Sequence, residues 1–80
     1  HPQVKLRISG HTDSQGREEV NLRLSQARAD AIKAYLHQEY KIADERVTAI
    51  GYGSSKPAAQ EETDDHRQLN RRVEFEIFKD

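Results

Sequence analysis

Apolar and polar residues alternate in two stretches of the chain. In Val4–Ile8 and in Val73–Ile77 every second residue is apolar, which is the period of a half-buried β-strand. A third short apolar run, Val47–Ile50, stops at a turn that contains two glycines and predicts another strand. The pattern therefore predicts three strands, with the first and the second separated by a long intervening segment.

That intervening segment predicts a long helix, which runs from about Glu18 or Asn21 to Tyr40 and contains neither Pro nor Gly. On a helical wheel Arg28 falls in the middle of the apolar arc, beside Leu24. We therefore expect Arg28 to face the protein interior. Because burying a guanidinium charge without a partner is costly, Arg28 either extends along the helix to water or meets an anion.

The order of these elements predicts the fold. A strand, a helix and a strand joined by a crossover of this length form a parallel pair with a right-handed connection. A short helix is predicted over Asp64–Leu69 with Thr63 as its cap, and the last strand can pair in either direction. The expected class is α/β (α+β), a two-layer sandwich of a small mixed sheet with helices on one face. Residues 1–80 are expected to form one domain with a thin core.

Composition narrows the partners. Charged residues make up 34% of the chain, but the formal net charge is only −1. This balance argues against nucleic acid and against an anionic membrane surface as bulk electrostatic partners. The sequence contains no Cys, which excludes disulfides, thiolate metal sites and a cysteine nucleophile and is compatible with a reducing or an oxidising compartment. No apolar run approaches the roughly 20 residues that span a bilayer.

Candidate chemistry gathers between the first strand and the long helix, where α/β sheets bind ligands. Asp13 alone is most often a turn or cap residue, but together with Arg28 it would suit a ligand that carries an amine and a carboxylate. Asn21 either caps the helix or presents its amide to a ligand. Arg71 and Arg72 precede the last strand, where such pairs are most often solvated or ion-paired at the surface. Because neighbouring strand residues face opposite ways, one of the two can reach over the ligand end.

No catalytic or metal-binding pattern is apparent. The four histidines lack metal-ligand spacing, and His11 is expected to brace its loop through a hydrogen bond. Ser14, His11 and Asp13 look superficially like a triad, but residues so close in one loop rarely align. The spacing from Gly10 to Gly16 lacks the Lys and Ser or Thr that follow in a phosphate loop. Enzyme chemistry is therefore not expected, and neither a cofactor nor a metal is required.

Several spaced strings together cover nearly the whole chain. They are Gly10-His11-Thr12-Asp13, Asn21-x-x-Leu24-Ser25-x-x-Arg28-Ala29, Gly51-Tyr52-Gly53, Pro57 and Thr63-x3-Arg67-x2-Asn70-Arg71-Arg72-Val73-Glu74. In this order the strings resemble the OmpA-like C-terminal domain, a peptidoglycan-binding family. That family includes the outer-membrane protein A tail, peptidoglycan-associated lipoprotein and MotB.

The resemblance implies noncovalent binding of peptidoglycan through the diaminopimelate residue of the stem peptide, which anchors the parent envelope protein to the cell wall. Asp13 and Arg28 correspond to the family's Asp and Arg. Asp13 would accept the ligand ammonium, while Arg28 would bind the ligand carboxylate and hold Asp13 in place. Thr12, Asn21 and Arg71 fall at positions that line the same pocket, with Arg71 as a second carboxylate contact.

The resemblance also implies a location in the periplasm of a Gram-negative bacterium, with attachment to the outer or inner membrane through the parent protein. A typical member has a further strand and helix before the strand at Val4–Ile8, so we expect an N-terminally truncated domain. An uncovered sheet edge can pair with a second copy, which leaves a homodimer open. The alternative function is a protein-interaction or assembly module that does not bind the wall. The presence of both Asp13 and Arg28 favours wall binding.

Overall fold

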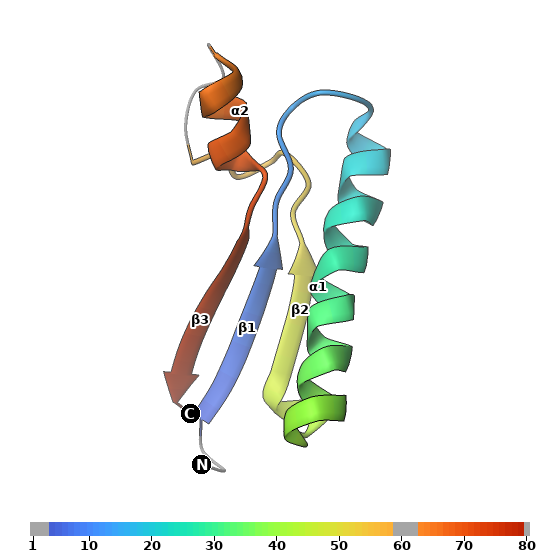
Figure 1. Cartoon of the computed structure of the whole chain (residues 1–80), viewed down its shortest axis with the longest axis vertical. Coiled ribbons are helices and arrows are strands. Elements are labelled where there is room, and N and C mark those ends of the chain that lie inside the picture. The colour runs from blue at the N-terminus through green and yellow to red at the C-terminus, as the bar shows by residue number, and fades with distance from the viewer. Residues whose placement is uncertain (1–3, 59–62, 80) are drawn as a thin grey trace.

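The computed structural model describes residues 4–58 and 63–79. All of the predicted helices and strands are present (Figure 1). Each strand continues one or two residues beyond its predicted end, and the long helix begins at the earlier of its two expected starts. Neither helix of the described part is long and apolar enough to cross a membrane. The elements are β1 (Val4–Gly10), α1 (Glu18–Tyr40), the 3-10 turn η1 (Asp44–Arg46), β2 (Val47–Gly51), α2 (Asp64–Asn70) and β3 (Val73–Lys79).

The three strands form one mixed sheet in the order β2-β1-β3. β1 and β2 are parallel, as predicted from the long crossover, whereas β1 and β3 are antiparallel. The register places Leu6 of β1 between Val47 of β2 and Ile77 of β3. α1 covers one face of the sheet, and α2 lies beyond the end at which β3 begins (Figure 1). The two-layer sandwich with a small mixed sheet is therefore confirmed.

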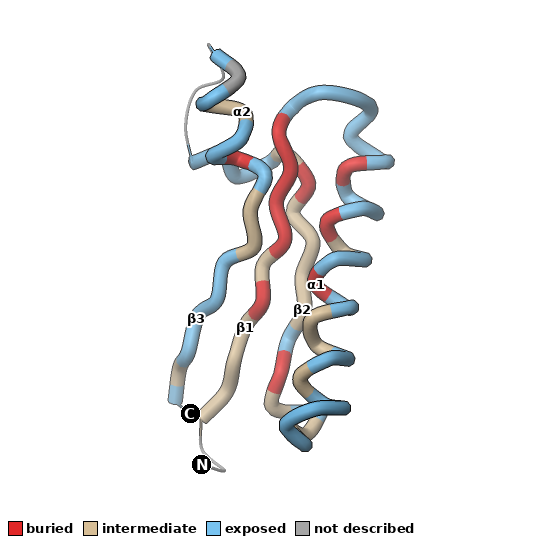
Figure 2. Tube along the Cα trace, viewed as in Figure 1, coloured by how far each residue is buried: buried red, intermediate tan, exposed pale blue. Residues whose placement is uncertain are grey.

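The hydrophobic core lies between α1 and the middle of the sheet. Ile8, Ala29 and Val47 are its buried members, and Figure 2 shows buried positions along β1, its following loop and one stripe of α1. A ring of partly buried apolar residues surrounds this cluster. They are Leu6, Ile32, Leu36, Ile42, Ala49 and Val73. The core is thin, as expected for a chain of this length.

Small and polar side chains form the buried stripe of α1, which consists of Asn21, Ser25 and Ala29. A Cβ atom at Gly10 or at Gly51 would overlap the backbone of α1. The two glycines therefore let the helix lie directly on the carboxyl ends of β1 and β2, and this close approach selects small side chains on the helix side.

The predicted inward orientation of Arg28 is wrong, because its side chain is exposed. Leu24 and Tyr35, which share its arc on the wheel, are also exposed, at 43% and 55%. The apolar arc on the wheel is wider than the strip of α1 that contacts the sheet. This contact is centred on the small residues of α1 and not on the middle of the apolar arc. Arg28 forms no hydrogen bond or ion pair with any residue in the described ranges.

Part of the sheet face that carries α1 remains uncovered over β3. The register places Phe75 beside Ile8, and Ile77 beside Leu6, on the core side of the sheet. Nevertheless Phe75 is 58% and Ile77 72% exposed, because α1 packs mainly on β1 and β2. The core therefore ends near the boundary between β1 and β3.

Candidate functional site

The loop that follows β1 begins as a continuation of the sheet. The His11 N–H donates to the Arg72 carbonyl at 2.8 Å, and the Arg72 N–H donates back at 3.3 Å. On the other side, the Thr12 N–H donates to the Gly53 carbonyl at 2.8 Å. His11, Thr12 and Asp13 are consequently buried, with 3%, 5% and 6% of their surface exposed. The backbone just before Asp13 is therefore held by the segments that follow β2 and precede β3.

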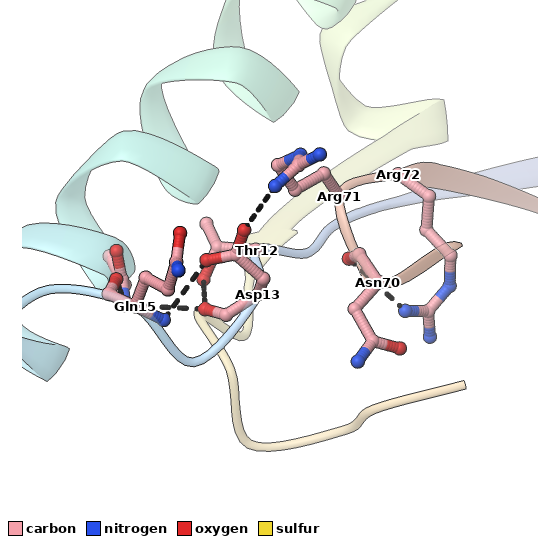
Figure 3. Close-up of polar contacts among 7 residues, drawn as sticks. Thr12, Asp13, Gln15, Asn70, Arg71 and Arg72 are labelled. Carbon is pink, nitrogen blue, oxygen red and sulfur yellow. Dashed lines mark hydrogen bonds and ion pairs between the residues drawn. The ribbon is translucent and has the colours of Figure 1, made fainter. Parts of the chain in front are cut away.

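Asp13 is held through both of its carboxylate oxygens. Its Oδ2 lies 2.5 Å from Nη1 of Arg71, and its Oδ1 accepts from the Gln15 N–H at 3.0 Å (Figure 3). The side chain of Arg71 is 44% exposed, whereas that of Asp13 is 9% exposed. The prediction that Arg28 holds Asp13 is wrong in this structure, since Arg71 is the partner.

Thr12 and Asn21 brace the backbone around Asp13. The Thr12 hydroxyl donates to the Asp13 carbonyl at 2.9 Å. The Asn21 side-chain amide donates to the same carbonyl at 3.4 Å and to the Gln15 carbonyl at 3.1 Å. Asn21 lies inside α1, and the residue at the N-cap position is Arg17, so the cap alternative for Asn21 is wrong. Both side chains act locally to shape the loop.

Arg71 and Arg72 point in different directions, as strand neighbours do (Figure 3). Arg71 reaches Asp13, so one of the two arginines extends toward the loop that follows β1. Arg72 pairs with Glu74 and donates to the Lys56 carbonyl at 2.9 Å. The hydrogen bond from Arg72 lowers the pKa of Glu74 below its ordinary value.

Two further residues of α1, neither of them a candidate from the sequence, hold the β2 side of the site. Ser25 is fully buried, and its Oγ accepts from the Gly53 N–H at 2.9 Å. Gln26 pairs with the edge of β2, donating to the Ala49 carbonyl at 2.9 Å and accepting from the Gly51 N–H at 2.8 Å. A Gln on the polar face of a predicted helix gives no signal for this role.

The loop after β2 is attached to both helices. Glu18 of α1 accepts from the Ser54 N–H at 3.2 Å and also from the Ser54 hydroxyl. Asn70 of α2 is completely buried, and its Oδ1 accepts from the Ala58 N–H at 2.7 Å. Thr63 caps α2 by accepting from the His66 N–H, as predicted. These contacts fix α2 at the sheet end, and α2 in turn presents Arg71.

His11 does not brace its loop through its side chain, and that prediction is wrong. Neither of its ring nitrogens has a hydrogen-bond partner among the described residues. The ring instead stacks on Tyr52, with centroids 5.5 Å apart and planes 17° apart. Burial lowers the pKa of His11, and the positive charges of Arg72 and Lys56 lower this pKa further. The imidazole is therefore neutral at neutral pH.

The five expected site residues thus separate into two groups. Thr12, Asp13, Asn21 and Arg71 are joined by direct contacts or through the loop, whereas Arg28 is not joined to them. Arg28 lies seven residues after Asn21, which is about 10 Å along the helix axis. In the described ranges, no three His, Asp or Glu side chains gather where they could hold a metal ion.

The sequence is similar to those of several known proteins. A sequence model of the OmpA family matches residues 1–71. Outer membrane porin F of Pseudomonas aeruginosa is 43% identical over 77 residues, which are 96% of this chain and 22% of that protein. The peptidoglycan-associated lipoprotein of Buchnera aphidicola is 40% identical over 72 residues, 90% of this chain and 41% of that protein. The chain therefore spans less than half the length of these relatives.

Solved structures share the fold. The peptidoglycan-associated lipoprotein from Burkholderia pseudomallei superposes with a TM-score of 0.90 at 33% identity, covering 98% of this chain and 65% of that chain. The C-terminal domain of Helicobacter pylori MotB gives 0.87 at 26% identity, covering 100% and 61%. The cell wall anchor of the T6SS from Pseudomonas aeruginosa gives 0.82 at 31% identity, covering 95% and 55%. With the family match over most of its length, the chain belongs to the OmpA family.

Proposed function

We propose that this domain binds peptidoglycan noncovalently through the diaminopimelate residue of the stem peptide. The observation that carries the proposal is the fixed, nearly buried carboxylate of Asp13 at the loop end of the sheet. The names of two similar proteins, a peptidoglycan-associated lipoprotein and a cell wall anchor, agree with this function. The domain would attach the protein that contains it to the cell wall, in the periplasm of a Gram-negative bacterium.

The chemistry of diaminopimelate matches the charges at this end of the sheet. The free end of its side chain carries an ammonium group and a carboxylate on the same carbon. Asp13 supplies an anion for the ammonium, in charge-assisted hydrogen bonds that are stronger than neutral ones. Arg71, already bound to Asp13, has an exposed portion that can bind the carboxylate. Thr12 and Asn21 contribute by holding Asp13 in position.

Arg28 keeps only one of the two roles that the resemblance implies for it, the contact with the ligand carboxylate. Because Arg71 already neutralises Asp13, Arg28 is not needed to hold that carboxylate. Side chains on a helix lean toward its N-terminus, which for α1 is the end beside the Asp13 loop. An exposed guanidinium without a partner in the described ranges is available to a ligand carboxylate. We therefore propose that Arg28 binds only the ligand, whereas Arg71 binds both the ligand and Asp13.

Co-sedimentation with purified sacculi that contain diaminopimelate tests this function. The wild-type domain should sediment with the wall, and Asp13→Ala and Arg28→Ala should stay in the supernatant while keeping their circular dichroism spectra. Arg23→Ala is the matched control for Arg28, because Arg23 is also an exposed Arg of α1. Unchanged sedimentation of both site variants would reject the site. If the wild type itself does not sediment, the alternative of an assembly module that does not bind the wall is favoured.

A further inference from the structure

A cavity lies on the sheet face opposite α1. Leu6 and Ile8 of β1 face the core, so the alternate residues Arg7 and Ser9 face the other side. The cavity has a volume of about 320 Å³. Besides Arg7 and Ser9, its lining includes His11, Tyr52, Lys56 and Glu74. None of these residues belongs to the group around Asp13.

The acidic groups of this cavity are already paired. Glu74 pairs with Arg72, and Glu76 pairs with Arg7 at 3.1 Å. Lys56 is different, because its ammonium lies 4.3 Å from the centre of the Tyr52 ring and forms no ion pair with a described residue. The carboxylates that could have attracted a cationic ligand are therefore neutralised, and the positive charge of Lys56 has no ion-pair partner among the described residues.

The polar groups left over in the cavity can all donate hydrogen bonds. The hydroxyls of Ser9 and Tyr52 make no side-chain hydrogen bond within the described ranges, and the Lys56 ammonium is free to donate as well. Behind Tyr52 lies His11, whose ring is buried and has no hydrogen-bond partner in the described part. Buried polar groups are nearly always hydrogen-bonded, so an unpartnered one beside a cavity calls for an explanation.

We infer that this cavity is a second ligand site, which binds a carboxylate of the wall polymer other than that of the diaminopimelate at Asp13. Lys56 would pair with the carboxylate, and the hydroxyls of Tyr52 and Ser9 would donate to it or to neighbouring oxygens. The inference rests on the proposed function and extends it from one residue of the stem peptide to a longer stretch of polymer.

The placement of the two arginines explains how one polymer can reach both sites. Arg71 is directed to Asp13, and the next residue, Arg72, is directed to Glu74 beside the cavity. His11, which lies at the cavity, and Asp13 are likewise only two residues apart in one loop. A ligand that contacts both sites would pass over the end of the sheet at this loop.

Two parts of the wall carry such a carboxylate. One is the stem peptide itself, and the other is muramic acid in glycan strands from which the peptide has been removed. Calorimetric titration with free diaminopimelate, with a disaccharide-tripeptide and with peptide-free glycan strands separates them. Lys56→Gln is the test variant because Lys56 is exposed, and Lys79→Gln, at an exposed position at the end of β3, is its control.

Lys56→Gln should weaken binding of the disaccharide-tripeptide or of the peptide-free glycan by about three- to tenfold, and the ligand affected identifies the source of the carboxylate. Its affinity for free diaminopimelate should equal that of the wild type, whereas Asp13→Ala should lose diaminopimelate. Wild-type affinity of Lys56→Gln for both larger ligands would overturn the second site. An equal loss for free diaminopimelate would overturn it too, because one site would then account for both effects. The proposed diaminopimelate site is rejected by a different result, namely an undiminished affinity of Asp13→Ala for free diaminopimelate.

Discussion

The Asp13 carboxylate and the Arg71 guanidinium form an ion pair at 2.5 Å, although 58 positions of the chain separate them. Asp13 belongs to the loop after β1, and Arg71 connects α2 to β3, so the pair joins two segments that meet only in the folded chain. A nearly buried carboxylate is thereby kept in place with a cation beside it. Arg28, which the resemblance places in this role, is exposed and unpaired in the described ranges.

Removing Arg71 should therefore destabilise the domain, whereas removing Arg28 should not. Arg71→Ala leaves the Asp13 carboxylate without its cation, and we expect the free energy of unfolding to fall by about 1–2 kcal/mol, since the exposure of Arg71 weakens the pair. Arg28→Ala should change this free energy by less than about 0.5 kcal/mol. Urea unfolding of the two variants measures the difference. A larger loss for Arg28→Ala than for Arg71→Ala would contradict the observed pairing.

The close contact between α1 and the strand ends predicts a large effect at two glycines. Gly10→Ala and Gly51→Ala would each place a methyl group against the backbone of α1, so unfolding should become easier by about 3 kcal/mol or more. Gly16→Ala is the comparison, because Gly16 has open surroundings but a φ of 87°. It should cost only about 1 kcal/mol. Equal effects at the three positions would contradict the close contact of Gly10 and Gly51 with α1, because of the three only Gly16 has a positive φ.

The pairing of Gln26 with the edge of β2 predicts a local effect. Gln26→Ala removes the acceptor of the Gly51 N–H and the donor to the Ala49 carbonyl, so the Gly51 amide hydrogen should exchange faster with solvent. Stability should fall by about 1–3 kcal/mol. Gln38→Ala, at an exposed position near the end of α1, should change neither quantity. An unchanged exchange rate at Gly51 in Gln26→Ala would argue against this contact.

The buried imidazole of His11 predicts a dependence of stability on pH. Its pKa is lowered from 6.5 by burial and by nearby positive charges, so the unfolded chain binds the proton more readily than the folded one. The neutral His11 imidazole therefore makes its full contribution to the free energy of unfolding above pH 6.5. This contribution is lost as the pH falls toward the pKa of His11 in the folded protein. His11→Phe keeps an aromatic ring beside Tyr52 but cannot titrate. Between pH 7.5 and 5.5 the stability of His11→Phe should fall less than that of the wild type, and an equal fall in the two proteins would contradict this role of His11.

The helices and strands could be predicted from the sequence, because they depend on neighbouring residues. The signals are the alternation of apolar and polar residues in the strands and the absence of Pro and Gly from the long helix. Val4–Ile8 and the helix that ends at Tyr40 illustrate this, since both lie where their periods predict. The sequence does not predict the direction of β3, because a short preceding helix fits either pairing. The antiparallel register with β1 is a property of the assembled sheet.

The orientation predicted for α1 is wrong, because a helical wheel shows only which residues lie on the same side of the helix. It carries no information on which part of that side contacts the sheet. Gly10 and Gly51 let the backbone of α1 at Ser25 and Gln26 lie directly against the sheet, so small residues form the buried stripe of the helix and Arg28 is exposed. The candidate residues themselves came from the resemblance. It identified Asp13 and the positions around it, but no local pattern shows that its cation comes from Arg71. Long-range pairs of this kind are visible only when the strands are assembled.

The affinity of the domain for two stem tripeptides that differ only at the third residue tests the central claim most directly. Diaminopimelate carries a carboxylate at the end of its side chain, and lysine has the same ammonium without it. Calorimetric titration should give clear binding of the diaminopimelate peptide, at least about tenfold weaker binding of the lysine peptide, and no binding of either by Asp13→Ala. Equal affinity for the two peptides, or undiminished binding by Asp13→Ala, would contradict recognition of diaminopimelate at this site.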